Sequence, residues 1–303
     1  MRMRWLGVVG AVAWIAVVIV VAAASDLGTA SAILFGVLGL MVVAVLVVGL
    51  TMHKLLLRVE SAPTTSAPAK PRPGKGRLAD ADVDRISGLV DKELKRTFRQ
   101  VEALQNLFAI LPIEHALPAS RGFPASPDLL LFLVDLVDRH RPKVIVECGS
   151  GLSTLCFALA MRRFGIDGKV IALEHLEQYA AQTEELLRRH GVADIAEVRT
   201  APLEDFTFGE ETTPWYAPAG WQDLEGVDLL FVDGPPAKLG PLARYPSLPF
   251  LIDRLAPGAR IVLDDYARTK ERVILERWQS EYPGRLSVES VPLEKGAALV
   301  TLD

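Results

Sequence analysis

The stretch Val144-Ile145-Val146-Glu147-Cys148-Gly149-Ser150-Gly151-Leu152-Ser153-Thr154 decides the fold class of this chain. Its first residues are apolar and β-branched, which favours a buried strand, and the residues after Gly151 favour a helix. Gly149 and Gly151 permit a sharp turn and let a ligand approach the backbone without meeting a Cβ atom. The helix start adds free N–H groups. The stretch therefore predicts an α/β domain that binds a ligand at this turn.

Strands and helices alternate after residue 120, which is typical of a doubly wound parallel sheet. We expect a seven-stranded sheet with strands at 143–148, 170–174, 195–200, 227–233, 259–264, 286–291 and 297–302. Helices are expected at 127–140, 152–164, 177–190, 245–255 and 269–281. No helical pattern separates the last two strands, so they should form a hairpin with an antiparallel last strand.

Glycine turns of this kind occur in several nucleotide-binding folds. The dinucleotide fingerprint requires a third glycine where this chain has Thr154, which disfavours a Rossmann-type NAD-dependent oxidoreductase. Glu174 ends the second strand, where a carboxylate can accept hydrogen bonds from both hydroxyls of a ribose. It could instead be a solvated residue that caps the next helix. His175 could pack against an adenine or lie on the surface.

Three acids follow two later strands. Asp233 ends the fourth strand, and Asp264 and Asp265 end the fifth. If these strands are neighbours, the carboxylates lie about 5 Å apart at the ligand-binding edge. Such a cluster needs a divalent cation, a trapped proton or a basic residue to neutralise it. Oxygen ligands suit Mg²⁺, so all three acids are candidate catalytic residues and candidate metal ligands. Alternatively, Asp264 or Asp265 caps the following helix.

Together, the run Glu147-x-Gly149-x-Gly151, the acid Glu174 and the run Phe231-Val232-Asp233-Gly234 resemble the class I S-adenosylmethionine-dependent methyltransferases. The resemblance covers residues 120–303, including the antiparallel last strand. Within that superfamily the chain is most similar to an uncharacterised bacterial group associated with sugar or polysaccharide modification. The similar runs are Ser126-Pro127-Asp128, Cys148 to Thr154, Asp233-Gly234-Pro235-Pro236 and Ala243-Arg244-Tyr245-Pro246.

The resemblance implies a Rossmann-like methyltransferase domain that binds S-adenosyl-L-methionine. The glycine loop would hold the methionine moiety, Glu174 the ribose, and the segment 201–203 would lie near the adenine. The cofactor-binding residues expected on this basis are Glu147, Gly149, Ser150, Gly151, Ser153, Thr154, Glu174, His175, Ala201, Pro202 and Asp233. Ser153 replaces the third glycine of the usual methyltransferase loop.

The acid cluster also resembles the metal site of catechol-type O-methyltransferases. Asp233 and Asp264 match that pattern, but Asp265 replaces an Asn, and Pro236 stands where the catalytic Lys is expected. These departures favour Asp233 as a metal-free base that takes the proton of a hydroxyl acceptor. The connection 204–225 carries Trp215, Tyr216 and Trp221, which could form a lid, an acceptor wall or a small core of their own.

The net charge of −4 and the pI near 5.8 disfavour nucleic acid as a partner. The mean hydropathy of +0.27 has a local source, the uncharged runs 5–25 and 28–52, each of which would span roughly 30 Å or more as a helix. We expect residues 1–58 to form a transmembrane helical hairpin. The first run could instead be a cleaved signal peptide. Basic residues flank the hairpin on both outer sides, which places both ends in the cytoplasm.

Residues 59–79 are basic and rich in Pro, and are expected to form an extended linker. Residues 80–119 have helical periodicity. This amphipathic segment should pack on the following domain, although it could also form a homodimer. Cys148 and Cys156 do not form a disulfide framework, which suits a reducing compartment.

The sequence thus predicts a multi-pass protein of the inner (cytoplasmic) membrane with its catalytic domain in the cytoplasm. We expect O-methylation of a glycan, a lipid-linked sugar or a related metabolite at the membrane face. The alternatives are the oxidoreductase and a non-catalytic cofactor-binding membrane scaffold.

Overall fold

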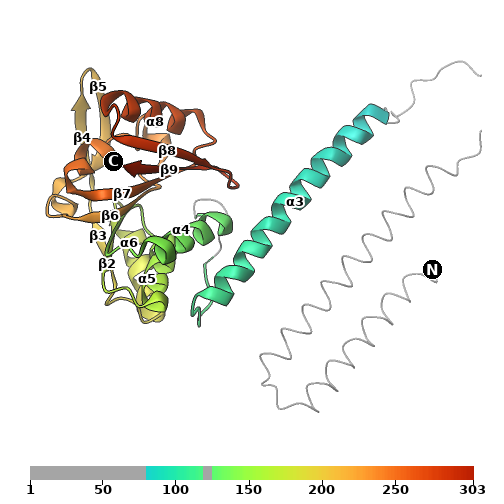
Figure 1. The fold of residues 1–303 in the computed structure, drawn as a ribbon, viewed down its shortest axis with the longest axis horizontal. Coiled ribbons are helices and arrows are strands. Elements are labelled where there is room, and N and C mark those ends of the chain that lie inside the picture. Colours follow the sequence, from blue (N-terminus) through green and yellow to red (C-terminus); the bar gives the residue numbers. More distant parts are fainter. Residues whose placement is uncertain (1–79, 119–124) are drawn as a thin grey trace, which may run out of the picture. The chain divides into compact units, whose positions relative to one another are not determined.

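The computed structural model describes residues 80–118 and 125–303, which belong to one compact unit. Figure 1 shows their helices and strands in chain order. The helices are α3 (Asp80–Ile110), α4 (Pro127–His140), α5 (Leu152–Phe164), α6 (Glu177–Arg189), α7 (Ser247–Leu251) and α8 (Thr269–Glu281). The strands are β1 (Val144–Cys148), β2 (Lys169–Glu174), β3 (Ala196–Thr200), β4 (Leu203–Phe208), β5 (Glu211–Tyr216), β6 (Val227–Val232), β7 (Leu255–Asp264), β8 (Leu286–Val291) and β9 (Ala297–Leu302).

A seven-stranded sheet in the order β3-β2-β1-β6-β7-β9-β8 forms the centre of the domain. The five strands from β3 to β7 are parallel, and β9 pairs antiparallel with both β7 and β8. This confirms the predicted α/β sheet and its antiparallel last strand. The strand order reverses between β1 and β6, where doubly wound sheets bind their ligands.

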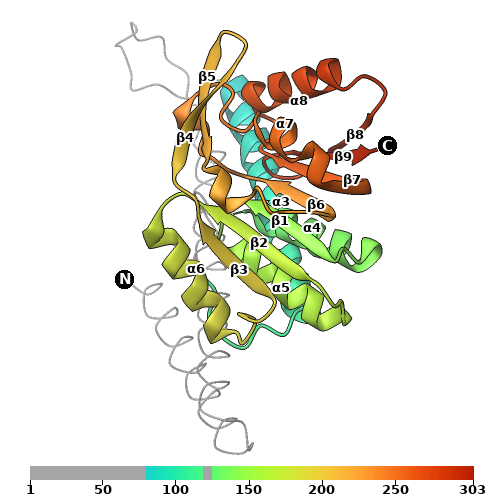
Figure 2. The same cartoon turned by 90° about the vertical axis from the view of Figure 1, so that its left-hand side faces the viewer.

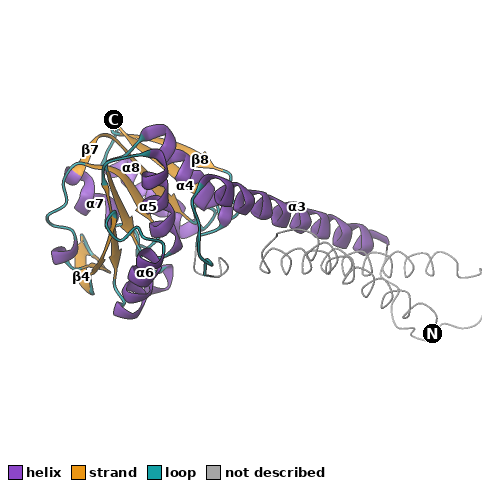
Figure 3. Cartoon of the chain, turned by 90° about the horizontal axis from the view of Figure 1, so that it is seen from below, coloured by secondary structure: helices purple, strands orange, loops and turns teal. Residues whose placement is uncertain are grey.

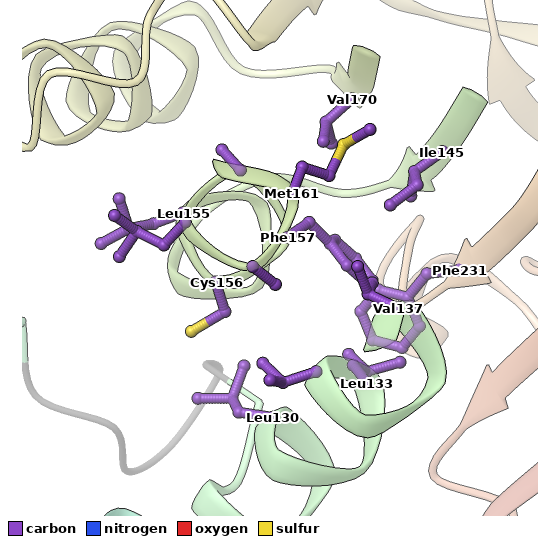
Figure 4. Close-up of a cluster of buried hydrophobic side chains, with 14 of the residues drawn as sticks. Leu130, Leu133, Val137, Ile145, Leu155, Cys156, Phe157, Met161, Val170 and Phe231 are labelled. Atoms are coloured by element: carbon purple, nitrogen blue, oxygen red, sulfur yellow. The ribbon is translucent and has the colours of Figure 1, made fainter. Parts of the chain in front are cut away.

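Helices cover both faces of the sheet (Figure 3). The strands alternate their side chains between the faces, so Ile145 and Phe231 pack with α4 and α5, whereas Val146 and Leu230 pack on the side of α7 and α8. In Figure 4, side chains of both α4 and α5 point toward the strands, with Val137 and Phe157 near Phe231. The helix α5 carries apolar residues around most of its circumference because it is covered on several sides.

A two-stranded hairpin that was not predicted occupies much of the connection 204–225. Strands β4 and β5 pair antiparallel and lie beside the large sheet in Figure 2. Trp215, Tyr216 and Trp221 are buried in the core on the α7 and α8 side. Of the roles considered for these aromatics, the structure therefore supports a core. The expected helix 245–255 is also shorter, since Tyr245 and Pro246 lie in a turn and residues 252–254 form a 3-10 helix.

The helix α3 packs on the domain through one face of its C-terminal half. Ala103 and Leu107 are buried against it, and Gln100 accepts a hydrogen bond from the backbone N–H of Asp128 at the start of α4 (3.1 Å). Arg96 donates to the carbonyl of Glu294 in the β8–β9 turn (2.9 Å). A second set of apolar side chains on α3 is exposed, namely Ile86, Leu89, Val90, Leu94, Phe98, Val101 and Phe108. Packing on the domain was the favoured expectation, and the homodimer stays a prediction.

The predicted transmembrane hairpin and linker lie outside the described residues. Within 80–118 and 125–303, no helix combines the length and apolar character needed to cross a bilayer.

Two leucines of α3 test which face of this helix packs. Leu107 is 1% exposed and Leu94 is 61% exposed. Leu107→Ala should lower the free energy of unfolding by about 2–5 kcal/mol, because it leaves a cavity. Leu94→Ala should change it by no more than about 0.5 kcal/mol. Urea unfolding of the full chain measures both. An equal loss in the two variants would mean that the exposed set is covered in solution.

Candidate functional site

The register of the parallel strands places the predicted site residues side by side. Cys148 pairs with Leu173 of β2 and with Val232 of β6, and Val232 pairs with Leu263 of β7. One residue further along each strand, Glu174, Gly149, Asp233 and Asp264 therefore stand in a row at the carboxyl edge of the sheet. This edge is where such sheets bind ligands.

The glycine turn has the backbone that its sequence predicts. Gly149 has φ +113° and Gly151 has φ +146°, which L side chains rarely adopt. The backbone N–H of Gly149 donates to the carbonyl of Leu173 (2.9 Å), so the turn is tied to the neighbouring strand. The helix α5 starts directly behind this turn and directs its first N–H groups toward the edge.

Glu147 lies beneath this turn. Its carboxylate is buried and accepts hydrogen bonds from the hydroxyls of Ser153 and Thr154 (2.7 Å for Thr154). Burial raises the pKa of Glu147 to about 8, and the two hydroxyls oppose that shift only in part. Ser153 and Thr154 were expected to bind the cofactor, but their hydroxyls are directed at Glu147. All three side chains therefore hold the shape of the loop.

Glu174 ends β2 with an ionised carboxylate. Burial alone would raise its pKa, but hydrogen bonds from His175, from the backbone of Leu176 (2.9 Å) and from Ser150 (3.2 Å) keep the pKa below its usual value. His175 Nδ1 lies 3.0 Å from Oε1 of Glu174. A carboxylate has about four acceptor positions, so at least one remains for a hydroxyl of a ligand. The hydroxyl of Ser150 also forms a hydrogen bond with the hydroxyl of Thr183 in α6 (3.0 Å), which ties the glycine turn to α6.

The segment after β3 differs from its expected role in one respect. The side chain of Ala201 is buried against Gly220, where an added Cβ atom would lie only 2.7 Å from it. Ala201 therefore faces the protein rather than a ligand. Pro202 is exposed, and its carbonyl accepts a hydrogen bond from Ala217 (2.8 Å). The prediction that this segment lies near an adenine stays a prediction.

The acid cluster forms as predicted, and a basic residue lies inside it. Ligand oxygens of Asp233, Asp264 and Asp265 all lie within 4.8 Å of one another. Nη2 of Arg244 donates to Oδ1 of Asp233 (2.9 Å) and to Oδ2 of Asp265 (3.1 Å). Nη1 of Arg244 donates to the backbone carbonyl of Asp264 (3.0 Å). One guanidinium thus joins the ends of β6 and β7.

Two further charged residues, Glu271 and Arg268, lie next to Arg244 and Asp265. Glu271 of α8 is buried, with Oε1 3.8 Å from Nη1 of Arg244. Arg268, which is half exposed, reaches Oδ2 of Asp265 (2.7 Å). Acidic neighbours raise the pKa of Arg244 although burial opposes this, so the guanidinium stays charged. No role was predicted for Arg244 from the sequence. It is the lone basic residue in the largely apolar run 241–252, and this isolation could have indicated a buried charge.

Exposure distinguishes the three acids. The side chain of Asp233 is 22% exposed, whereas Asp264 and Asp265 are 2% and 3% exposed. Burial raises the pKa of Asp264 to about 8, and the neighbouring acids Asp233 and Asp265 add to the shift, which favours the protonated form of Asp264. Of the three predicted catalytic acids, Asp233 is therefore the one that can reach a substrate.

Tyr216 of the hairpin also reaches this edge. A Cβ atom on Gly234 would lie 2.5 Å from its hydroxyl oxygen, so glycine is required for the close approach. Its ring centroid lies 6.5 Å from that of His175. Tyr216 therefore stands between the Glu174 side and the Asp233 side of the site, which the sequence did not reveal because the hairpin was not predicted.

Residues 146–266 match a family model described as a methyltransferase domain. The matched range includes the glycine turn, Glu174, the acids at the ends of β6 and β7, and Arg244. No curated protein is significantly similar to the chain in sequence.

Several solved structures are similar to this chain at low sequence identity. A methyltransferase of Podospora anserina, PaMTH1, bound to SAH, is 17% identical with a TM-score of 0.48, over 78% of this chain and 100% of that chain. A methyltransferase of Geobacter sulfurreducens is 17% identical with a TM-score of 0.44, over 72% and 96%. An O-methyltransferase of Bacillus cereus in complex with SAH is 20% identical with a TM-score of 0.44, over 67% and 90%.

The buried carboxyl of Glu147 makes a testable contribution to stability. Its pKa is about 8 in the folded protein and lower in the unfolded chain, so the folded state keeps a proton that unfolding releases. This contribution is present at low pH and is lost as the pH rises through about 8. Glu147→Gln keeps the shape without the titration. Its urea midpoint should therefore fall less than that of the wild type between about pH 6 and pH 9.

All other titrating groups are shared by the two proteins, so their difference isolates Glu147. Parallel pH dependences would show that Glu147 is already ionised in the folded state.

Proposed function

We propose that the chain is an S-adenosylmethionine-dependent O-methyltransferase of bacteria. The observation that carries the proposal is the methyltransferase-domain match, which coincides with the carboxyl edge where the glycine turn, Glu174 and Asp233 meet. The glycine turn and helix α5 would hold the methionine moiety, and Glu174 would accept a hydrogen bond from a ribose hydroxyl. These residues fit the cofactor, because the positive-φ glycines leave the backbone open and Glu174 is ionised with an acceptor position to spare.

When bound, S-adenosylmethionine supplies a methyl group that its sulfonium charge has already activated. The protein must therefore orient the acceptor, exclude water and remove the proton of the acceptor hydroxyl. Asp233 is suited to remove this proton because it is the exposed acid of the cluster. Oδ1 of Asp233 is held by Arg244, which leaves Oδ2 for the acceptor.

A divalent cation on Asp233, Asp264 and Asp265 is the alternative way to activate a hydroxyl. The three carboxyl groups are close enough to bind one. However, Arg244 already makes hydrogen bonds to two of these carboxylates, so the residues present do not fit a bound dication. We therefore assign the activation to Asp233 as a base.

For the acceptor we propose a glycan, a lipid-linked sugar or a related metabolite at the cytoplasmic face of the inner membrane. Support comes from the sequence: the uncharged runs 5–25 and 28–52 have the length of two membrane spans, and basic residues flank them on both outer sides. A hairpin anchor of this kind would hold the domain close to acceptors carried on lipids. The exposed apolar set of α3 is the surface available for the proposed homodimer.

The cofactor role of Glu174 can be tested by calorimetry with S-adenosylmethionine and SAH. Glu174→Ala removes the acceptor position proposed for a ribose hydroxyl, a bond worth about 1.5–3 kcal/mol with a charged partner. We expect the affinity to fall by about 10- to 100-fold. Glu185→Ala, which removes an exposed carboxylate on α6, should leave the affinity unchanged. Unchanged binding in Glu174→Ala would remove this residue from the site, and tight NADH binding by the wild type would replace the proposal with an oxidoreductase.

The proposed topology can be tested with reporters fused after Asp303. A reporter that works only in the cytoplasm should be active, and one that works only after export should be inactive, because the basic flanks stay inside. Activity of the exported reporter would place the domain on the other side of the membrane, away from the cytosolic supply of its cofactor.

A further inference from the structure

We propose that Arg244 is the built-in cation of the acceptor site and positions Asp233 as the base, so that this chain needs no divalent metal for catalysis. The inference rests on the proposed methyltransferase function and deepens it. It identifies Arg244 as a positioning residue, because its side chain is 4% exposed and acts through Asp233.

The contacts of Arg244 indicate a structural link between the two strand ends. Its Nη1 and Nη2 atoms bind the carbonyl of Asp264 and the carboxylates of Asp233 and Asp265. The strands β6 and β7 approach each other through backbone hydrogen bonds as far as the pair Val232 and Leu263. Beyond that pair, the guanidinium of Arg244 links the ends of the two strands. Removing it would leave buried carboxylates without their counter-charge, which is costly in a protein interior.

The same contacts leave little place for a metal ion. Magnesium ions bind carboxylate oxygens at about 2.0–2.1 Å, which requires these oxygens to point toward one centre. Oδ1 of Asp233 and Oδ2 of Asp265 instead accept hydrogen bonds from Arg244. A dication there would lie close to a guanidinium that cannot lose its proton in a protein. Two cations would then compete for the same carboxylates.

Two buried carboxylate oxygens near Arg244 show that its acidic neighbours are only partly paired. In the described part of the chain, Oδ1 of Asp265 and Oε2 of Glu271 have no hydrogen-bond partner. Arg244 and Arg268 therefore contact these two acids only through the opposite oxygens, Oδ2 of Asp265 and Oε1 of Glu271. Loss of Arg244 should turn this cluster into a site with strong affinity for an added cation.

The reaction then proceeds without a metal. The acceptor hydroxyl lies against Oδ2 of Asp233, which in the described residues accepts no hydrogen bond from the protein. Its proton passes to Oδ2, and the lone pair of the acceptor oxygen forms the new bond to the methyl carbon. The carbon–sulfur bond of the donor breaks, and its electron pair stays on sulfur. Arg244 keeps its proton and holds Oδ1 in place, so that Oδ2 faces the acceptor.

The first experiment measures metal binding without any acceptor. The full chain in mild detergent is titrated with Mn²⁺ and with EDTA, and the unfolding temperature and the SAH affinity are recorded. We expect the wild type to show no change in either quantity. Arg244→Gln should bind Mn²⁺ and gain unfolding temperature from it, while its SAH affinity stays within a few-fold of the wild type.

Arg277→Gln is the matched control. Arg277 is also an arginine paired with two acids, but it contacts Glu211 and Glu281 rather than the acid cluster. This variant should not gain Mn²⁺ binding. Metal binding in the wild type with a rise in unfolding temperature would overturn the proposal. If Arg244→Gln fails to fold, the wild-type titration decides by itself, because the proposal requires that Mn²⁺ leave the wild type unchanged.

The second experiment measures transfer of the labelled methyl group of S-adenosylmethionine to a total glycolipid extract of the source cells. EDTA should leave the wild-type rate unchanged. Arg244→Gln should lower kcat by about 100-fold, as expected when a reacting group is misplaced, with little change in KM for S-adenosylmethionine. Asp233→Asn should also abolish transfer while it binds SAH normally, and Mn²⁺ should restore part of the rate only in Arg244→Gln.

Inhibition of the wild type by EDTA with recovery on Mn²⁺, or full kcat in Arg244→Gln, would contradict the role of Arg244. A wild type that binds neither S-adenosylmethionine nor SAH would instead contradict the proposed function, and the Mn²⁺ titration would still report on the acid cluster.

Discussion

Four parallel strands must end at one edge of the sheet, and the candidate site depends on this constraint. The backbone pairing of β2, β1, β6 and β7 fixes the height at which each strand stops. Glu174, Gly149, Asp233 and Asp264 are consequently brought together although they come from distant parts of the chain. No long-range contact among their side chains is needed to align them, because the hydrogen bonds of the strands have already done so.

The site then separates into two halves with different electrostatics. On the side of β2, hydrogen bonds from His175 and a backbone N–H stabilise an ionised Glu174. On the side of β6 and β7, burial would make several acids costly, and the guanidinium of Arg244 together with the raised pKa of Asp264 offsets that cost. Glu174, a carboxylate that can accept hydrogen bonds from hydroxyl groups, therefore lies beside an acid cluster whose negative charge is largely neutralised. This arrangement is suited to a reaction that moves one proton away from a neutral acceptor while a positively charged donor loses its charge.

Much of the fold could be predicted from the sequence because local patterns and global topology agree. The glycine turn, the acid at the end of β2 and the missing helix between β8 and β9 each have a short-range signal. The hairpin of β4 and β5 was missed because Asp, Glu and Pro residues weaken its strand pattern. Tyr216 could be placed at the site only through that hairpin.

The acid cluster could be predicted, but not what neutralises it. Charge balance required a cation, a proton or a basic residue, and the sequence left these alternatives open. Arg244 lies in a turn between β6 and α7, where no periodicity indicates the direction of a side chain. Its identity as the neutralising group depends on burial and on distances that only the folded chain defines. For the same reason, the burial of Ser153 and Thr154 hydroxyls against Glu147 could not be foreseen.

The backbone conformation of Asp265 limits which residues can stand at this position of the acid cluster. This residue has φ +61°, a left-handed conformation that Asp and Asn tolerate better than most other side chains. The turn would therefore accept either residue, and the choice of Asp over Asn changes a charge while it leaves the shape almost the same. Positions 244 and 265 can be regarded as one electrostatic unit. A protein with Asn at position 265 has one acidic partner fewer for an arginine at position 244. A protein with Asp at position 265 provides that partner, so the arginine is retained with it.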